Sequence, residues 1–455
     1  MKSGIEIAQT TGQLDTKTGV SRGTLGAVLR RRNFRLLWMG QGISALGDQF
    51  YLIALPWLVL HLTRDALAVG TVLALAAFPR ALFMLVGGAL IDRFSPRRVM
   101  LASNTLRLVL VTLLTLLILT DLVQMWMLYG FALLFGLVDA FFYPAQPALI
   151  PQLVEKEQLQ IGNVLIQGTA MLSLFAGPVL AGGLIALLDA GSVQGEAAAA
   201  HTLGIAIAFG LDAASFLASL LTLWMIRITA AKEAGEEAEQ QEGMFSSIRA
   251  GLEHAWNDYP LRLLGLNAVA ITLLINGPLA VSIPVLSATR FAGGAAAFGT
   301  IMSAFGGGAL LGMVLSSVLP KPAPRRTIAT LLVVVSCEGI ALALMGLVAS
   351  TLLAALLAVA LGTADGYSSI TLLTWVQKRT PPEMRGRTMS LVQFVGIGLV
   401  PVSTPIAGAL LKLNPTLFLL LAGGLMTALS LLSALNFLAR EKDMAEPATP
   451  QAGGV

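Results

Sequence analysis

Twelve long apolar runs dominate this sequence, and they limit the chain to one kind of fold. Each run reaches the roughly 20 residues that an α-helix needs to cross the hydrocarbon core of a bilayer. Strands of membrane β-barrels are about half that length, and a bilayer offers no water to satisfy an open backbone. The sequence therefore predicts an all-α polytopic membrane protein. The expected helices cover residues 34–61, 67–91, 99–119, 123–149, 161–188, 202–228, 262–289, 296–318, 326–348, 351–376, 387–411 and 414–438.

The composition agrees with that prediction and excludes several functions. Hydrophobic residues make up 56% of the chain and charged residues 12%, whereas soluble domains carry about 25% charged residues. The three histidines, His61, His201 and His254, are scattered, and Cys337 is the single cysteine, so we expect no metal site and no disulfide. Neither a phosphate-binding loop nor a His-Glu-x-x-His motif occurs, so we expect no cofactor and no enzymatic activity.

Lysine and arginine fall mainly on one side of the expected helices. With the N-terminus in the cytoplasm, cytoplasmic segments hold 24 of the 29 basic residues, two lie within spans, and the external loops hold Arg64, Arg290 and Lys412. Under the positive-inside rule, this asymmetry predicts that both termini are cytoplasmic. The net charge of +4 is thereby explained by membrane topology, and we expect no nucleic-acid partner.

The polar stretch of residues 230–259 is the longest internal connector and divides the expected helices six and six. We expect it to be a solvated linker between two bundles. The predicted organisation is a cytoplasmic tail at 1–33, a first six-helix bundle at 34–228, a cytoplasmic linker at 229–261, a second bundle at 262–438 and a cytoplasmic tail at 439–455.

The two sets of six helices carry a weak internal repeat. An offset of 229 residues places "VGT" at 69–71 on "FGT" at 298–300. Because loops of different length separate the helices, the offset is expected to drift along the chain. An offset of 226 aligns Gly136 with Gly362, Asp139 with Asp365, Glu157 with Glu383, Gln167 with Gln393 and Gly182 with Gly408.

The short connector "GGALIDRFSPRRVM" at 87–100 concentrates charges between two apolar runs. It resembles the signature that the major facilitator superfamily carries between its second and third helices, which reads roughly Gly-x-x-x-Asp-Arg-x-Gly-Arg-Arg. It departs from that pattern at Ser95 and Pro96. The matching residues are Gly88, Asp92, Arg93, Arg97 and Arg98. The resemblance implies two pseudo-symmetric six-helix bundles that rock about a central site.

In such a transporter the connector would act as a cytoplasmic latch. Asp92 would meet the positive N-terminus of a helix in the other half, which contributes about 0.3–1 kcal/mol when exposed. Gly88 would allow close helix approach. Arg93, Arg97 and Arg98 would pair with acidic residues such as Asp139 or with lipid head groups. In the alternative interpretation these arginines only set the topology.

Charged residues within membrane spans are costly and are therefore candidates for function. Asp48 and Arg80 lie near mid-membrane on consecutive helices, where they would form either a proton-responsive pair or a permanent ion pair. Arg107, Asp139 and Asp365 are predicted to act in gating. Asp212 and Glu338 have no evident partner in the sequence, and each is a candidate for proton or substrate coupling.

The fifth expected helix carries a second informative pattern. Gly177 and Pro178, followed by Gly182 and Gly183, resemble the antiporter motif of proton-driven drug exporters in the same superfamily, although a proline-kinked packing face would also account for them. The segments "RNFRLLWMGQGISALGDQFYLIALPWLVL" and "PALIPQLVEKEQLQIGNVL" resemble the branch that contains the enterobactin exporter and macrolide efflux proteins.

This resemblance implies a proton-coupled exporter in a bacterial inner membrane. The expected cargo is a hydrophobic or amphipathic small molecule of the drug, macrolide or siderophore type, with protons as the coupling ion and the lipid bilayer as the surroundings. An importer, a lysophospholipid flippase and a transport-inactive relative remain as alternatives. The oligomeric state stays open, with a monomer as the expectation.

Overall fold

The computed structural model describes residues 22–91, 95–155, 158–190, 202–227, 252–253, 256–320, 322–323, 326–380 and 382–445. Within these ranges every regular element is a helix, short turns and loops join the helices, and there is no strand. Twelve helical segments are long and apolar enough to cross a membrane. The predicted all-α fold with twelve spans is confirmed.

The helices of the first half begin at residue 22 and those of the second half at residue 259. The first half comprises α1 (Arg22–Arg30), α2 (Arg32–Thr63), α3 (Ala66–Ile91), α4 (Pro96–Leu119), α5 (Met125–Leu149), α6 (Leu159–Ala190) and α7 (Leu203–Met225). The second half comprises α9 (Tyr259–Ile271), the π-helical turn η4 (Thr272–Asn276), α10 (Gly277–Thr289), α11 (Ala295–Val318), α12 (Thr327–Met345), α13 (Thr351–Arg379), α14 (Pro382–Gly398), α15 (Val400–Leu413) and α16 (Pro415–Ala445).

Two of the expected spans are interrupted near their middle. The span expected at 262–289 contains the π-helical turn η4, directly before Pro278. The span expected at 387–411 is divided at Leu399, two residues before Pro401. Proline has no N–H to donate and its ring crowds the carbonyl one turn earlier, so the backbone widens or breaks at both places.

The short helix α1 lies within the stretch expected to be a tail. Its Val28 is fully buried and packs in one cluster with Phe34 and Leu37 of α2 and Ile166 of α6. The apolar residues of α1 therefore cover the first-half helices at the end where α2 begins. At the other terminus α16 continues to Ala445, seven residues beyond the expected end of the last span.

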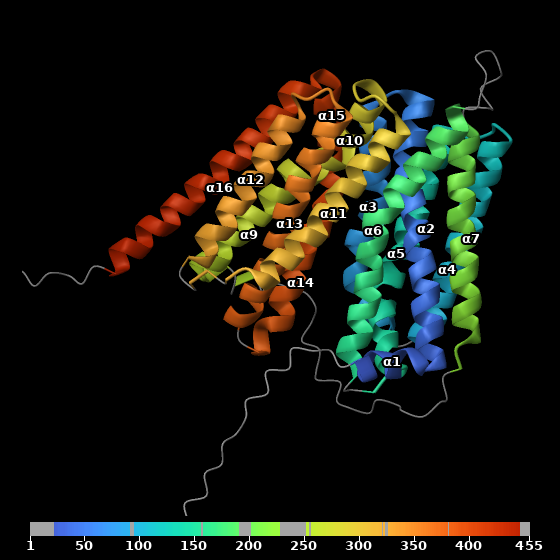
Figure 1. Cartoon of the computed structure of the whole chain (residues 1–455), viewed down its shortest axis with the longest axis horizontal. Coiled ribbons are helices and arrows are strands. Elements are labelled where there is room, and N and C mark those ends of the chain that lie inside the picture. Colours follow the sequence, from blue (N-terminus) through green and yellow to red (C-terminus); the bar gives the residue numbers. More distant parts are fainter. Residues whose placement is uncertain are drawn as a thin grey trace, which may run out of the picture.

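The helices of the two halves lie on opposite sides of the molecule (Figure 1). They meet mainly along two helix pairs, α6 with α11 and α3 with α15. We call the end at which α7 stops and α9 starts the linker end, and the opposite end, where α2 connects to α3, the Asp65 end. In Figure 1 the helices of the two halves come together at the Asp65 end and diverge toward the linker end.

The contact between α6 and α11 is close enough to require glycine. A Cβ atom at Gly182 would collide with the carbonyl oxygen of Ala295, and one at Gly299 would collide with that of Pro178. Backbone atoms cannot move aside as a flexible side chain can. Small residues at these positions let the two backbones touch, as they do at many membrane helix interfaces.

The contact between α3 and α15 repeats this arrangement. A Cβ atom at Gly408 would lie 2.5 Å from the carbonyl oxygen of Ala66, and one at Gly70 would collide with that of Thr404. The repeat offset of 229 residues maps Gly70 of α3 onto Gly299 of α11, and the offset of 226 residues maps Gly182 of α6 onto Gly408 of α15. The two halves therefore meet through two equivalent helix pairs, as the internal repeat predicts.

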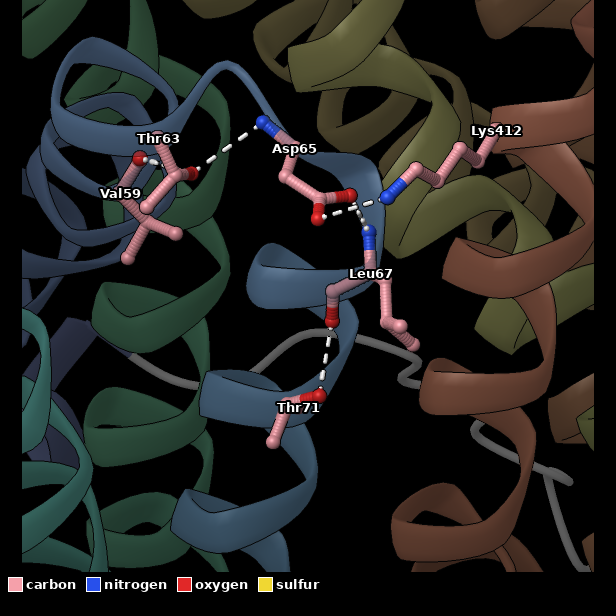
Figure 2. A network of polar contacts seen from close by, with 6 residues as sticks. All are labelled: Val59, Thr63, Asp65, Leu67, Thr71 and Lys412. Carbon is pink, nitrogen blue, oxygen red and sulfur yellow. Dashed lines mark hydrogen bonds and ion pairs between the residues drawn. The ribbon is translucent and has the colours of Figure 1, made fainter.

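An ion pair joins the halves at the Asp65 end (Figure 2). Lys412 Nζ of α15 donates to Asp65 Oδ2 at 3.1 Å, while the backbone N–H of Leu67 donates to Asp65 Oδ1 at 2.9 Å. Asp65 is thus both an ion-pair partner and the acceptor that caps the start of α3. The Thr63 hydroxyl donates to the carbonyl oxygen of Val59 and accepts from the Asp65 N–H, which orders the turn.

Candidate functional site

A cavity of about 410 Å³ lies between the helices, chiefly within the first half. Most of its lining comes from α2, α3, α5 and α6, and Ala280, Val400 and Thr404 reach it from the second half. Its volume falls in the range of about 300–1,000 Å³ that is typical of small-molecule sites. Polar side chains gather on the first-half wall: Gln41, Ser44, Asp48, Gln49, Tyr51, Arg80, Arg107, Asp139, Tyr143 and Gln146.

Asp139 of α5 is the centre of a buried charge cluster. Its Oδ2 accepts from Arg80 of α3 and its Oδ1 from Arg107 of α4. The Arg107 side chain is 2% exposed and that of Arg80 is 31% exposed, so Arg80 is the more accessible of the two cations. Both arginines are ionised at any physiological pH, which makes this a fixed arrangement of two positive charges about one carboxylate.

The expected pairing of Arg80 with Asp48 is wrong, because Arg80 pairs with Asp139. The reason lies in the packing of α3 on α5. A Cβ at Gly136 would collide with the carbonyl oxygen of Ala76, so the two helix backbones touch there. Arg80 lies four residues after Ala76 and Asp139 three residues after Gly136, and this contact brings their side chains together.

Aromatic rings enclose the arginines. The Arg107 guanidinium lies 4.1 Å from the centre of the Phe142 ring, and Phe135 and Phe216 flank it at 5.6 and 5.5 Å. The Arg80 guanidinium lies 5.0 Å from the centre of the Tyr143 ring. Ring faces attract cations within about 6 Å. These aromatic rings are functional candidates that the sequence reasoning missed, although two of them, Phe142 and Tyr143 in "DAFFYP", lie within four residues of Asp139.

Two further carboxyls lie within electrostatic range of this cluster. Asp48 of α2 lines the cavity, and no described residue forms an ion pair or hydrogen bond with its side chain. Asp212 of α7 is completely buried, and neither of its carboxyl oxygens has a hydrogen-bond partner among the described residues. The first half thus brings together Asp48, Arg80, Arg107, Asp139 and Asp212.

The remaining two acidic candidates meet in the second half. Glu338 of α12 is 1% exposed, and its Oε1 accepts from the Ser368 hydroxyl of α13 at 3.1 Å. Asp365 lies within electrostatic range of Glu338. No described residue supplies a cation to this pair. Its role in gating or coupling stays a prediction.

The connector between α3 and α4 is described only in part. Asp92 and Arg93 lie outside the described residues, as does the packing around Gly88. Arg97 does not reach Asp139; it donates to the carbonyl oxygens of Leu223 at 3.0 Å and Trp224 at 2.8 Å. These carbonyls lie in the last turn of α7, where that of Leu223 also accepts from the Ile226 N–H at 3.3 Å, so Arg97 adds to the cap of that helix.

Arg98 has a different position in the same connector. Its backbone N–H donates to the Ser95 hydroxyl at 3.4 Å, which caps the start of α4, and its side chain is exposed. The serine that departs from the family pattern therefore has a structural use as a helix cap.

The antiporter-like residues of α6 lie at the contact between the halves. Pro178 and Gly182 touch α11, as described above, and the N–H of Val179 donates to the Ser303 hydroxyl of α11 at 2.8 Å. Gly177 instead packs against the Gln49 side chain of α2. A Cβ at Gly183 would meet nothing within 4 Å.

The chain resembles several known transporters over most of its length. It matches the Major Facilitator Superfamily profile over residues 37–404. The multidrug efflux pump Tap of Mycolicibacterium fortuitum is 26% identical over 376 residues, which cover 81% of this chain and 86% of that protein. Macrolide efflux protein A of Streptococcus pyogenes is 21% identical over 366 residues, covering 79% and 84%.

The solved structures show the same fold. A crystal structure of a mutant form of the nucleoside transporter NupG superposes with a TM-score of 0.67 at 14% sequence identity. The superposition covers 90% of this chain and 99% of that one. With twelve spans, two equivalent contacts between its halves and a family match over most of its length, the chain belongs to the major facilitator superfamily of membrane transporters.

Proposed function

We propose that the protein is a proton-coupled exporter of a hydrophobic or amphipathic small molecule. The observation that carries this proposal is the cavity, because both halves line it and its first-half wall holds charged groups within the membrane span. A site between two repeats is what alternating access requires, since rocking of one half against the other exposes it to each side in turn.

The chemistry of the cavity favours a lipophilic cargo that carries a positive charge. Leu52, Leu55, Leu73 and Phe142 supply apolar surface. Among the lining carboxyls, Asp139 is already paired with two arginines, whereas no described residue pairs with Asp48. A cationic group on the cargo would therefore find its counter-charge at Asp48, and the aromatic rings would bind its apolar part.

The direction of transport is inferred from the relatives. Tap and macrolide efflux protein A are both named as efflux proteins, and they match most of the chain. For export from a bacterial cytoplasm, the linker end and both termini would lie on the cytoplasmic side of the inner membrane. The glycine contacts and the Asp65–Lys412 ion pair then hold the halves together on the outer side, and the connector with Asp92 is the latch for the inner side.

The test uses purified protein in liposomes and the fluorescent cation ethidium. We expect an imposed proton gradient to drive ethidium across the membrane, and Asp48→Asn to remove at least nine-tenths of this movement. Asp121→Asn is the matched control, because it removes an exposed carboxyl in the turn between α4 and α5, where asparagine keeps the left-handed backbone.

Each other outcome changes the proposal in a defined way. Ethidium movement at the same rate with and without the proton gradient would exclude proton coupling. Movement that survives Asp48→Asn would place coupling elsewhere. If ethidium does not move but a fluorescent lysophospholipid does, the protein is a flippase and the exporter proposal fails.

A further inference from the structure

The Asp212 carboxyl lies in surroundings that do not suit an ionised group. The side chain is completely buried, and both oxygens lack a hydrogen-bond partner among the described residues. The neighbouring Ser215 hydroxyl donates its single proton to the backbone carbonyl oxygen of Asp212 at 2.7 Å. The Ser215 hydroxyl is also within hydrogen-bonding reach of the carboxyl. While it donates to the backbone oxygen, it has no second proton and can only accept from the carboxyl. An acceptor suits a protonated carboxyl, which has a hydrogen to donate.

The helices around Asp212 carry several charged or titratable side chains. These groups are Asp48 and Tyr51 of α2, Arg107 of α4 and Asp139 of α5. On α6, the Asp189 carboxyl packs against Gly204, eight residues before Asp212 and thus about 12 Å away along the helix. Arg107 is the one cation among them, and it is hydrogen-bonded to Asp139.

The charge count of the buried cluster points to one bound proton. Two guanidinium groups, Arg80 and Arg107, face three carboxyls, Asp48, Asp139 and Asp212. With all five groups ionised the cluster carries one uncompensated negative charge in a low-dielectric interior, which is expensive. One proton makes it neutral. Asp139 does not need that proton because it accepts from both arginines.

The packing of α2 on α7 links Asp212 to the cavity through Asp48. A Cβ at Gly47 would lie 3.0 Å from Asp212 Oδ1 and would collide with the Ser215 hydroxyl, so the carboxyl rests on the α2 backbone beside Asp48. Asp48 lines the cavity, whereas Asp212 has no exposed surface. Asp212 can thus exchange a proton with the cavity only by way of a neighbour.

We propose that Asp212 is a proton-binding site and that it exchanges its proton with Asp48, so that the two carboxyls form one unit with Asp48 as its cavity-facing member. In the exchange the Asp212 O–H bond breaks as an O–H bond forms on the Asp48 carboxylate, and the net charge of the cluster does not change. The role of this unit in coupling rests on the proposed export function, but the proton occupancy of Asp212 does not.

Infrared spectroscopy of the purified protein in lipid at pH 7 tests the occupancy without any substrate. The spectrum of the wild type minus that of Asp212→Asn should contain one carbonyl band of a protonated carboxylic acid, which shifts in D₂O. The same band should persist in Asp65→Asn, which leaves all five groups of the buried cluster in place. Its absence from the difference spectrum, or its loss in Asp48→Asn with retention in Asp212→Asn, overturns the assignment.

Asp212→Asn has the shape and charge of a protonated aspartate and should fold. Asp212→Ser provides a second variant that removes the carboxyl without adding bulk. The same band should be missing from its spectrum.

Ethidium transport in proteoliposomes tests the exchange. Asp212→Asn should lose at least nine-tenths of the gradient-driven movement and keep equilibration of ethidium without a gradient. Full gradient-driven movement in Asp212→Asn overturns the exchange with Asp48. If the wild type moves no ethidium, the export proposal fails for this cargo, while the infrared result still decides whether Asp212 holds the proton.

Discussion

The same two helix positions carry opposite chemistry in the two halves. Arg107 is the twelfth residue of α4 and Glu338 the twelfth of α12, while Asp139 and Asp365 are each the fifteenth residue of α5 and α13. In the first half these positions form an ion pair; in the second they place two acids within electrostatic range of each other. The repeat thus preserves where side chains meet and not which charges they carry.

This difference separates two tasks between the halves. At these positions the first half holds the Asp139 carboxyl between two guanidinium groups, Arg80 and Arg107. The second half has no described cation near Glu338 and Asp365, so ionisation of both would leave a like-charge pair in the interior, and one proton removes that repulsion. At the two equivalent positions, the first half thus holds an ion pair, and the second half holds two acids without a described counter-charge.

The contacts between the halves show a similar pattern. The glycine contacts of α6 with α11 and of α3 with α15 are equivalent, but the repeat offsets carry Asp65 onto Gly294 and Lys412 onto Ala186. The Asp65–Lys412 ion pair therefore has no counterpart at the α6–α11 contact. A hydrogen bond from the N–H of Val179 to the Ser303 hydroxyl joins the halves there instead.

Loss of the first-half cation should have the largest effect. Arg107→Met removes a buried partner of Asp139 and leaves the carboxylate with Arg80 alone. Breaking a buried ion pair in this way costs about 3–5 kcal/mol. Thermal unfolding of the purified protein in detergent should show a much lower midpoint. The double variant Arg107→Met with Asp139→Asn should lose less than the sum of the two single variants; additive losses would contradict a coupled pair.

Overpacking of the α6–α11 contact should have the next largest effect. Gly182→Ala places a methyl group against the backbone of α11, which should cost about 1–3 kcal/mol and slow transport. The adjacent Gly183→Ala is the matched control, because its methyl group meets nothing within 4 Å and alanine favours helix. Equal stability of the two variants would show that the halves do not depend on this contact.

At the Asp65 end, loss of Asp65 should destabilise the protein more than loss of its ion-pair partner Lys412. Lys412→Ala removes a partly exposed ion pair, worth about 0–1 kcal/mol. Asp65→Ala removes the same pair and also the cap on the Leu67 N–H, which adds roughly 1 kcal/mol. Comparison of the two unfolding midpoints checks this order. Equal losses for the two variants would mean that the ion pair, and not the cap, is the main contribution of Asp65.

The second-half pair should give the smallest effect. Glu338→Gln keeps the shape of the side chain and removes one of two neighbouring acids, so stability should change by less than about 1 kcal/mol, in contrast to Arg107→Met. Unfolding in detergent measures both variants side by side. A loss as large as that of Arg107→Met would mean that Glu338 is ionised and paired, and the contrast between the halves would not hold.

The sequence alone predicted how many helices there are, roughly where they run and how the halves repeat. These features depend on apolar length, on the positions of glycine and on the bilayer as a solvent, all of which are visible in one dimension. The same reasoning identified Asp48, Arg80, Arg107, Asp139 and Asp212 as buried charges, because a charge inside an apolar run is conspicuous.

Only the tertiary structure decided which of these groups meet. A few tens of degrees of rotation about a helix axis change the neighbour of every side chain, and the sequence does not specify that rotation. The glycine contact at Gly136 sets it for α3 and α5 and brings Arg80 to Asp139 instead of Asp48. The contact at Gly47 likewise places Asp212 behind Asp48, where the one described cation that acts on it, Arg107, is already paired with Asp139.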